Sequence, residues 1–141
     1  VTHKWYYVLP AMTWNRIFGW VVPYVHRPES FIKINDRTQI GKYFMYQTMP
    51  TAGVRQLDQV GVQASKPDTL RRIACPLLLV HSHNDEASSP EADKRAFQAF
   101  PSLKKQEVWV ARSNHVLLWD YDRERIKGHI GHFLLEDLVS P

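Results

Sequence analysis

The sequence has almost no cysteine and no long hydrophobic run. Cys75 is the single cysteine among 141 residues, so no disulfide can form within the chain and no cysteine-based zinc or iron–sulfur cluster can assemble. This usage suits a reducing compartment, and we expect a cytoplasmic protein in which Cys75 is packed rather than reactive. The longest apolar stretch near the start, residues 17–25, is interrupted by Gly19 and Pro23 and is too short to span a bilayer.

The excess of positive charge is small and lies in the first half of the chain. Residues 1–70 carry eight Lys and Arg against four acidic residues, whereas residues 71–141 carry ten of each. The surplus is scattered among aromatic side chains, with no basic run and no nucleic-acid-binding motif. We therefore interpret it as an ordinary solvated surface rather than as a nucleic-acid interface.

Residues 71–141 alternate between strand and helix patterns. The apolar run 77–80 and the alternating run 107–111 predict two strands. Ser89 and Pro90 predict the start of a helix between them, which Pro101 ends. A last helix is expected from Tyr121 onwards, with an apolar stripe made of Ile126, Ile130, Phe133, Leu134 and Leu138. Repeated strand–helix units predict an α/β fold with a parallel sheet and helices packed on its faces.

The first half of the chain is less regular. Residues 1–46 hold eleven of the seventeen aromatic side chains, and residues 11–70 contain four prolines between short helical patches. We expect a possible sheet strand in residues 1–10, with residues 5–9 as a third parallel strand, then a helical cap-like or lid-like insertion over 11–70 rather than a sheet. The aromatic side chains form either the core of this insertion or a lid over an apolar pocket. The βαβα core then occupies residues 71–141.

Chemically active side chains follow each of the two later strands. The first strand is followed by HSHNDE (residues 81–86) and the second by SNHV (residues 113–116). The carboxyl ends of parallel strands lie at one edge of a sheet, so Asp85 and His115 are expected to meet there. A carboxylate that holds an imidazole in one tautomer makes it a general base toward a hydroxyl group.

These two segments resemble the C-terminal half of α/β-hydrolase-fold serine hydrolases, most like the carboxylesterase and monoacylglycerol-lipase branch. There, I-x-x-P-x-L-x-x-H-x-x-x-D supplies the triad acid and S-x-H-V the triad histidine, matching residues 73–85 and 113–116 here. The match covers residues 68–138, and residues 1–67 look like the sixth strand and cap of that family. The resemblance implies cofactor-free hydrolysis of a small ester or lipid substrate, with Asp85 as the acid and His115 as the base.

The serine of that family is missing from this chain. Its G-x-S-x-G motif, which lies upstream of the acid, occurs nowhere in the 141 residues, and Ser82 stands where a glycine is usual. Ser82 and Ser113 are too close to the proposed triad members to replace the nucleophile. We therefore expect a chain that is inactive alone and that associates, through the open edge of the strand expected at residues 5–9, with a missing N-terminal half or with itself.

Several other interpretations of these residues remain open. Asp85 can form an Asx turn, His115 can be a loop histidine satisfied by backbone groups, and Glu86 competes for the role of acid. A non-catalytic, hydrolase-like binding module is the main alternative to an enzyme.

Metal binding is a further alternative. The spacing His81-x-His83-x-Asp85 resembles the metallo-β-lactamase zinc motif, although Glu86 follows where that motif has a histidine. His129 and His132, three residues apart on the last expected helix, are a weaker metal candidate.

Overall fold

The computed structural model describes residues 5–6, 9–10, 13, 16–17 and 19–137. Its central unit is a pair of parallel strands, β5 (Leu77–Ser82) and β6 (Lys105–Val110), in which Leu77 lies opposite Lys105 and Ser82 opposite Val110. Helix α4 (Pro90–Ala99) connects the two strands, and α5 (Arg123–His132) follows β6 and continues into a π-helical turn, Phe133–Asp137. The expected α/β arrangement is confirmed for this part of the chain.

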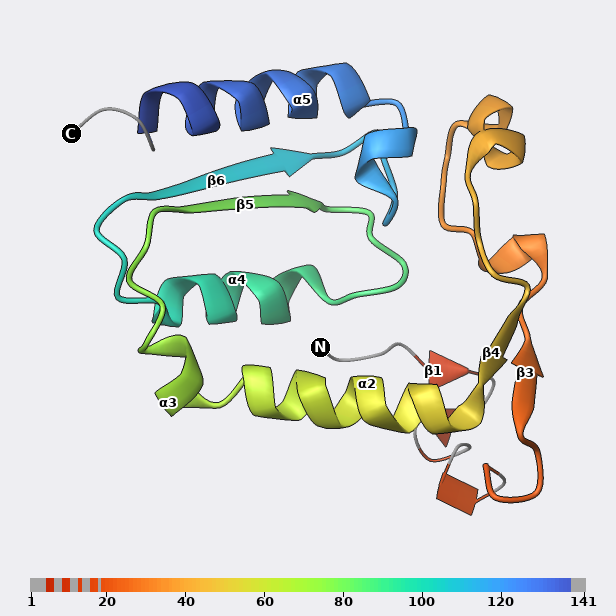
Figure 1. The fold of residues 1–141 in the computed structure, drawn as a ribbon. Coiled ribbons are helices and arrows are strands. Elements are labelled where there is room, and N and C mark those ends of the chain that lie inside the picture. Colours follow the sequence, from red (N-terminus) through yellow and green to blue (C-terminus); the bar gives the residue numbers. More distant parts are fainter. Residues whose placement is uncertain (1–4, 7–8, 11–12, 14–15, 18, 138–141) are drawn as a thin grey trace.

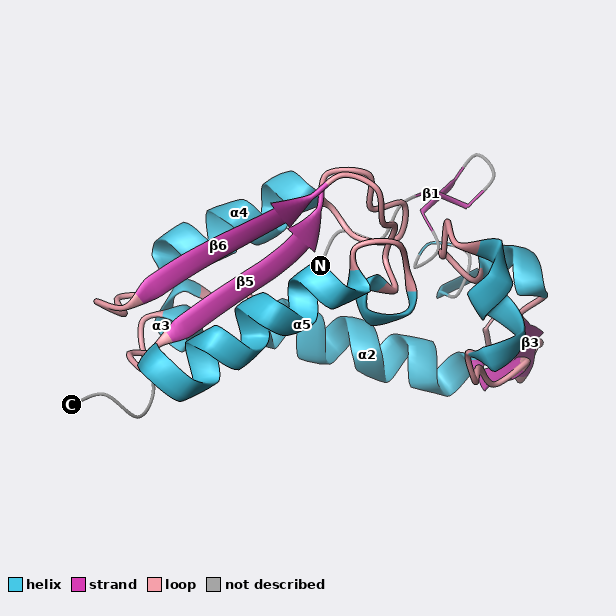
Figure 2. Ribbon diagram, turned by 90° about the horizontal axis from the view of Figure 1, so that it is seen from above, coloured by secondary structure: helices cyan, strands magenta, loops and turns pink. Residues whose placement is uncertain are grey.

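The two helices cover opposite faces of the strand pair, as Figures 1 and 2 show together. On the face of α5, Ile126 packs with Val108 and Val110 to form a small core, and half-buried Leu78 and Val80 lie against it. On the other side, Phe97 of α4 is buried. This sandwich fixes the strand ends, and therefore the loops that follow them, at one edge of the molecule.

Helix α4 begins where the sequence predicts. The Ser89 hydroxyl accepts a hydrogen bond from the backbone N–H of Ala92 (3.3 Å), and Pro90 occupies the first helical position. The helix ends at Ala99, before Pro101, because proline cannot continue the ladder of hydrogen bonds.

Replacing Ser89 with Ala is expected to lower the free energy of unfolding by about 1 kcal/mol, because the N–H of Ala92 loses its acceptor. Urea unfolding followed by tryptophan fluorescence measures the change. Ser65→Ala is the control, since the Ser65 hydroxyl donates to an exposed carbonyl, that of Gly61, at the end of helix α2 (Thr51–Ala64). An unchanged unfolding midpoint for Ser89→Ala would contradict the capping role.

The structure corrects the prediction of a third parallel strand at residues 5–9. Strand β1 (Trp5–Tyr6) pairs antiparallel with β2 (Leu9–Pro10), not parallel with β5, so the parallel sheet has two strands among the described residues rather than about three. Pairing between near neighbours closes a far shorter loop than pairing with β5, and Pro10 has no N–H to donate to a central strand. Part of the expected strand, residues 7–8, lies outside the described residues.

The insertion over residues 11–70 was expected to be helical without a sheet, and it contains one. Strands β3 (Tyr24–His26) and β4 (Thr48–Pro50) form an antiparallel pair, with Val25 opposite Met49. Figure 1 places this pair well away from β5 and β6. Between and after the strands lie short helical segments and the longer helix α2, with these bounds: Glu29–Phe31, Arg37–Lys42, α2 Thr51–Ala64 and α3 Pro67–Leu70.

Exposure corrects two further expectations and decides one open alternative for four aromatic side chains. Cys75 is exposed rather than packed. Leu134, expected on the buried stripe of the last helix, is 48% exposed, and Leu138 lies outside the described residues. The insertion has exposed aromatic side chains, which excludes the core interpretation for these four: Trp20, Tyr24, Phe44 and Tyr46.

Within the described ranges, the helices are all too short or too polar to cross a bilayer.

Candidate active site

Asp85 lies in the loop that follows β5, and its two carboxylate oxygens have different partners. Oδ1 accepts the backbone N–H groups of Ala87 (2.7 Å) and Ser88 (2.8 Å), which is the Asx-turn geometry. Oδ2 accepts the Ser88 hydroxyl (2.9 Å) and also faces His115. The side chain is only 5% exposed. Oδ1 therefore has the contacts of the turn interpretation, and Oδ2 has the contact with a histidine that the acid interpretation requires.

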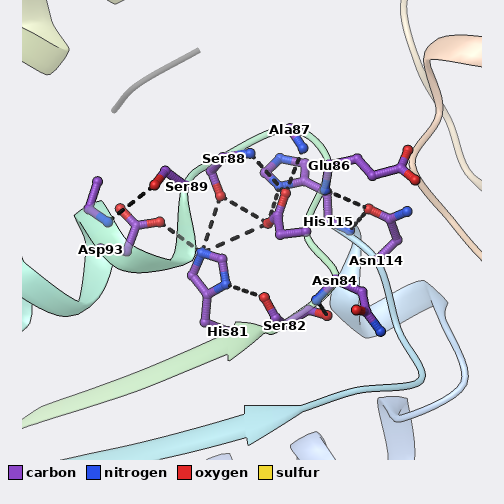
Figure 3. A network of polar contacts seen from close by, with 12 residues as sticks. His81, Ser82, Asn84, Glu86, Ala87, Ser88, Ser89, Asp93, Asn114 and His115 are labelled. Carbon is purple, nitrogen blue, oxygen red and sulfur yellow. Dashed lines mark hydrogen bonds and ion pairs between the residues drawn. The ribbon is translucent and has the colours of Figure 1, made fainter. Parts of the chain in front are cut away.

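His115 lies in the loop after β6 (Figure 3), and its Nδ1 is 2.9 Å from Oδ2 of Asp85. A carboxylate oxygen can only accept in this contact, so Nδ1 carries the proton and donates it. In the neutral ring Nε2 is then an acceptor, and none of the described residues forms a hydrogen bond with it. The His115 side chain is 48% exposed. Asp85 and His115, which are expected from the sequence to lie close together, are therefore in contact, and Nε2 of His115 points away from the carboxylate.

The pKa values of the pair move in opposite directions. Burial alone would raise the pKa of Asp85, but the hydrogen bonds from His115, Ser88 and Ala87 outweigh burial and hold this pKa far below its usual range. The hydrogen bond to Asp85 raises the pKa of His115 against the opposing effect of burial, and the charges of Asp85 and Asp93 add to the increase. A carboxylate that stays charged next to an imidazole made more basic is the electrostatic arrangement of a general base.

Asn114 fixes the separation of the two loops. Its side-chain oxygen accepts the backbone N–H of Glu86 (3.1 Å) in the acid loop and that of His115 (2.9 Å) in its own loop. The side chain is buried, so both hydrogen bonds are shielded from water. This role could not be predicted from the sequence, because an asparagine beside a histidine has no distinctive spacing.

Ser82 and Ser113 have structural partners and no access to a substrate. Both are fully buried. The Ser82 hydroxyl donates to the backbone oxygen of Ser113, and the Ser113 hydroxyl donates to Asp122 (2.9 Å).

The competing candidates near Asp85 have other contacts. The Glu86 carboxylate forms an ion pair with Lys33 (2.9 Å) rather than with His115. His81 directs Nε2 toward Asp93 (2.8 Å) and has a longer contact of 3.8 Å with Oδ2 of Asp85, while the ring of His83 stacks on Trp109 with centroids 5.0 Å apart. Across the described residues, no three His, Cys, Asp or Glu side chains are arranged to hold a metal ion, so neither His81, His83 and Asp85 nor His129 and His132 form such a site there.

A shallow polar cleft of about 420 Å³ lies beside the pair. Its lining consists of amide, imidazole and carboxylate side chains, and Asn35 contributes to it from the insertion. An acyl chain would find little apolar surface there. The lining residues are Asn35, His83, Asn84, Asp85, Glu86 and Asn114.

Solved structures share this fold. The chain superposes on the crystal structure of a monoacylglycerol lipase from Paleococcus ferrophilus with a TM-score of 0.71 and 15% identity, covering 94% of this chain and 55% of the lipase. It superposes on a soluble variant of monoglyceride lipase from Saccharomyces cerevisiae with a TM-score of 0.70 and 11% identity, covering 86% and 47%. With the strand–helix order and the position of the loops, these matches define the chain as part of an α/β-hydrolase fold.

The chain is also similar in sequence to lipolytic enzymes. The chain is 34% identical over 85 residues to a thermostable monoacylglycerol lipase from a Bacillus species, a match that covers 60% of this chain and 33% of the lipase. A structure of metagenome-derived lipolytic enzymes matches with a TM-score of 0.59 and 26% identity, over 64% of this chain and 36% of that chain. No protein-family model matches the sequence. The chain thus spans about a third of the length of the curated relative.

Proposed function

We propose that this chain supplies the acid, Asp85, and the base, His115, of a serine hydrolase that acts on carboxylic esters. The observation that carries the proposal is the 2.9 Å contact between Nδ1 of His115 and Oδ2 of Asp85, with the other ring nitrogen directed away from the acid. Similarity to lipolytic enzymes supports the same reaction class. No cofactor takes part in this chemistry.

The proposed reaction proceeds through an acyl-enzyme. Nε2 of His115 takes the proton of a serine hydroxyl while the serine oxygen attacks the ester carbonyl carbon, giving a tetrahedral oxyanion and an imidazolium. Asp85 stabilises that imidazolium, whose proton then passes to the leaving alcohol as the ester C–O bond breaks. Water repeats the sequence on the acyl-enzyme, which releases the carboxylic acid and restores the serine.

The serine and the oxyanion donors are proposed to come from polypeptide outside these 141 residues. The support is the absence of G-x-S-x-G from the sequence and the full burial of Ser82 and Ser113.

A fluorophosphonate probe tests this directly, since an activated serine displaces its fluoride and becomes covalently phosphonylated. The 141-residue chain alone is expected to remain unlabelled and to leave p-nitrophenyl esters unhydrolysed above the buffer rate. Protein from the native source is expected to be labelled on a serine within G-x-S-x-G, located by peptide mass spectrometry. Labelling of any serine in the isolated chain, or rapid ester turnover by it, would contradict the proposal.

The insertion over residues 11–70 is proposed to act as a cap that holds the apolar part of the substrate. Four of its aromatic side chains are between 62% and 80% exposed, and the polar cleft beside Asp85 offers no comparable apolar surface. The proposed substrates are accordingly esters with one apolar group, such as monoacylglycerols, which the similar lipases are named for.

A non-catalytic interaction module is the second candidate, and the free edge of β5 favours it. β5 pairs with β6 on one side, and no described strand pairs with its other edge. A two-stranded sheet is marginal by itself, and an unpaired edge is a template for another strand. We expect light scattering at high concentration to show self-association of the isolated chain, whereas a soluble monomer would argue against strand addition at this edge.

A further inference from the structure

Asp120 is the centre of a buried polar hub next to the histidine loop. The residue is fully buried, and its carboxylate accepts four backbone N–H groups. Oδ2 accepts those of Asn35 and Asn114, both at 2.8 Å. Oδ1 accepts those of Asp36 (2.9 Å) and Tyr121 (2.8 Å). One side chain thereby joins the histidine loop to a part of the chain about 80 residues earlier.

That earlier part, residues 32–36, is called the bridging segment here because it contacts both loops of the site. Its Lys33 carbonyl accepts the backbone N–H of Val116 (3.1 Å), and the Lys33 ammonium binds Glu86 in the acid loop (2.9 Å). The Asn35 side chain donates to the carbonyl of Arg112 (2.9 Å). Ile34 is 2% exposed, so the segment is held in the interior at the same time.

A second charged contact ties the hub to the start of α5. The Arg123 guanidinium binds the Asp36 carboxylate (3.0 Å) and donates to the backbone oxygen of Asp120 (3.2 Å). The bridging segment, the histidine loop and α5 therefore converge on Asp120. Removing its carboxylate would leave four N–H groups without an acceptor, and unsatisfied buried donors are costly enough to force the backbone to rearrange.

This rearrangement would change the position of the His115 imidazole. Asn114 is adjacent to His115, and its side-chain oxygen accepts the His115 N–H. Because Asp120 holds the N–H of Asn114, it fixes the peptide from which the His115 side chain projects. Geometry at this level matters to catalysis, since a displacement of about 1 Å in a catalytic group can cost about 100-fold in rate.

We propose that Asp120 is the positioning residue for His115, and that through it the bridging segment couples the insertion over residues 11–70 to the His115–Asp85 pair. This coupling between the insertion and the pair depends only on contacts within the chain. Its consequence for turnover rests on the proposed hydrolase function. A change in the insertion that pulls residues 35 and 36 away from Asp120 would move the imidazole.

The test compares Asp120→Ala, Asp120→Asn and Asn35→Ala by proton NMR in the 141-residue chain. The readout is the downfield resonance of the His115 Nδ1 proton in its hydrogen bond to Asp85, together with the amide exchange of Asn114. Asp120→Ala is expected to abolish the resonance and speed that exchange at least tenfold. Asp120→Asn keeps one acceptor oxygen and is expected to retain part of the signal. Asn35→Ala keeps the backbone N–H that binds Asp120 and removes only the side-chain hydrogen bonds to Arg112 and Asn114, so it should weaken the signal less than Asp120→Asn.

Phe97→Leu is the control for general destabilisation. Phe97 is buried on α4, which covers the face of the strand pair opposite α5, so the substitution lowers stability but should leave the His115 resonance in place. An Asp120→Asn variant that folds with unchanged His115 resonance and unchanged exchange would overturn the proposal. Loss of the His115 resonance in Phe97→Leu as well would also overturn the proposal, because general destabilisation would then explain its loss in the Asp120 variants.

Ester hydrolysis separates this inference from the proposed function. In a protein that contains the nucleophile, Asp120→Asn is expected to lower kcat about 10- to 100-fold with little change in KM. NMR changes without any hydrolase activity in the native protein would leave the positioning role intact and refute the hydrolase. Unchanged NMR signals in an active hydrolase would refute the positioning role alone.

Discussion

Replacing His115 with Ala is expected to lower kcat for p-nitrophenyl esters by about 10⁴- to 10⁶-fold in a protein that combines this chain with its nucleophile. The serine hydroxyl would have no base to take its proton, and the leaving alcohol no acid to protonate it. KM should change little, because the imidazole contributes mainly to the transition state. Steady-state assays with purified wild-type and variant protein measure the difference.

His132→Ala is the matched control for that experiment. His132 is an exposed histidine at the end of α5, far along the helix from the site, and its removal should leave kcat within about twofold of wild type. Full turnover by His115→Ala would rule out His115 as the base. Equal losses in both variants would show that the assay reports folding rather than chemistry.

Replacing Asp85 with Asn is expected to lower the pKa of His115, because the carboxylate favours the charged imidazolium and the amide does not. The effect can be measured in the isolated chain by following the His115 ring protons through an NMR pH titration. In the assembled hydrolase, the same change should reduce kcat about 10⁴-fold, since an amide can select the wrong tautomer of the ring.

The same pair makes stability depend on pH in two directions. The folded-state pKa of Asp85 is depressed, so its contribution is present above the unfolded value of about 3.9 and is lost as the pH falls toward the folded value. The folded-state pKa of His115 is raised, so its contribution is complete below about 6.5 and is lost as the pH rises through the folded value. The pair therefore stabilises the fold most between about pH 4 and 6.5.

Urea unfolding across that range checks the sign. Asp85→Asn is expected to cost about 2 kcal/mol near pH 5.5 and progressively less as the pH falls, because the wild type then loses the same charge. Asp68→Asn, at a residue whose carboxylate lies in an exposed pair with Arg71, should change stability by only a few tenths of a kcal/mol. A pH-independent difference between wild type and Asp85→Asn would contradict the linkage.

Local patterns were sufficient to predict the second half of the fold. The apolar run before residue 81, the Ser89–Pro90 start signal and the stop at Pro101 each depend on neighbours a few residues apart, and the structure places β5 and α4 accordingly. The prediction was wrong where a strand can pair with several partners that are distant in the sequence. Residues 5–9 look like a buried strand, yet strand pairing requires an available partner, and β1 pairs with β2 instead.

The contact between Asp85 and His115 could be predicted, because the loops that follow parallel strands lie at the same edge of the sheet. Two residues that each follow such a strand are therefore close in space. The rest of the site could not be predicted. Asp120, Asn114 and Lys33 act through backbone groups and through partners that lie 28 to 85 residues away, and a residue that accepts backbone N–H groups leaves no periodic pattern.

The sequence by itself determined which chemistry is available: one carboxylate and one imidazole after successive strands, and no G-x-S-x-G serine to complete them. Composition and spacing suffice for that, because they depend only on residue identity and local periodicity. Only the tertiary structure decided which oxygen of Asp85 meets His115, which serines are sealed in the interior, and that residues 32–36 hold the two loops together. These contacts depend on hydrogen bonds between buried polar groups that are distant in the sequence, and such partners become neighbours only when the helices, strands and loops pack together.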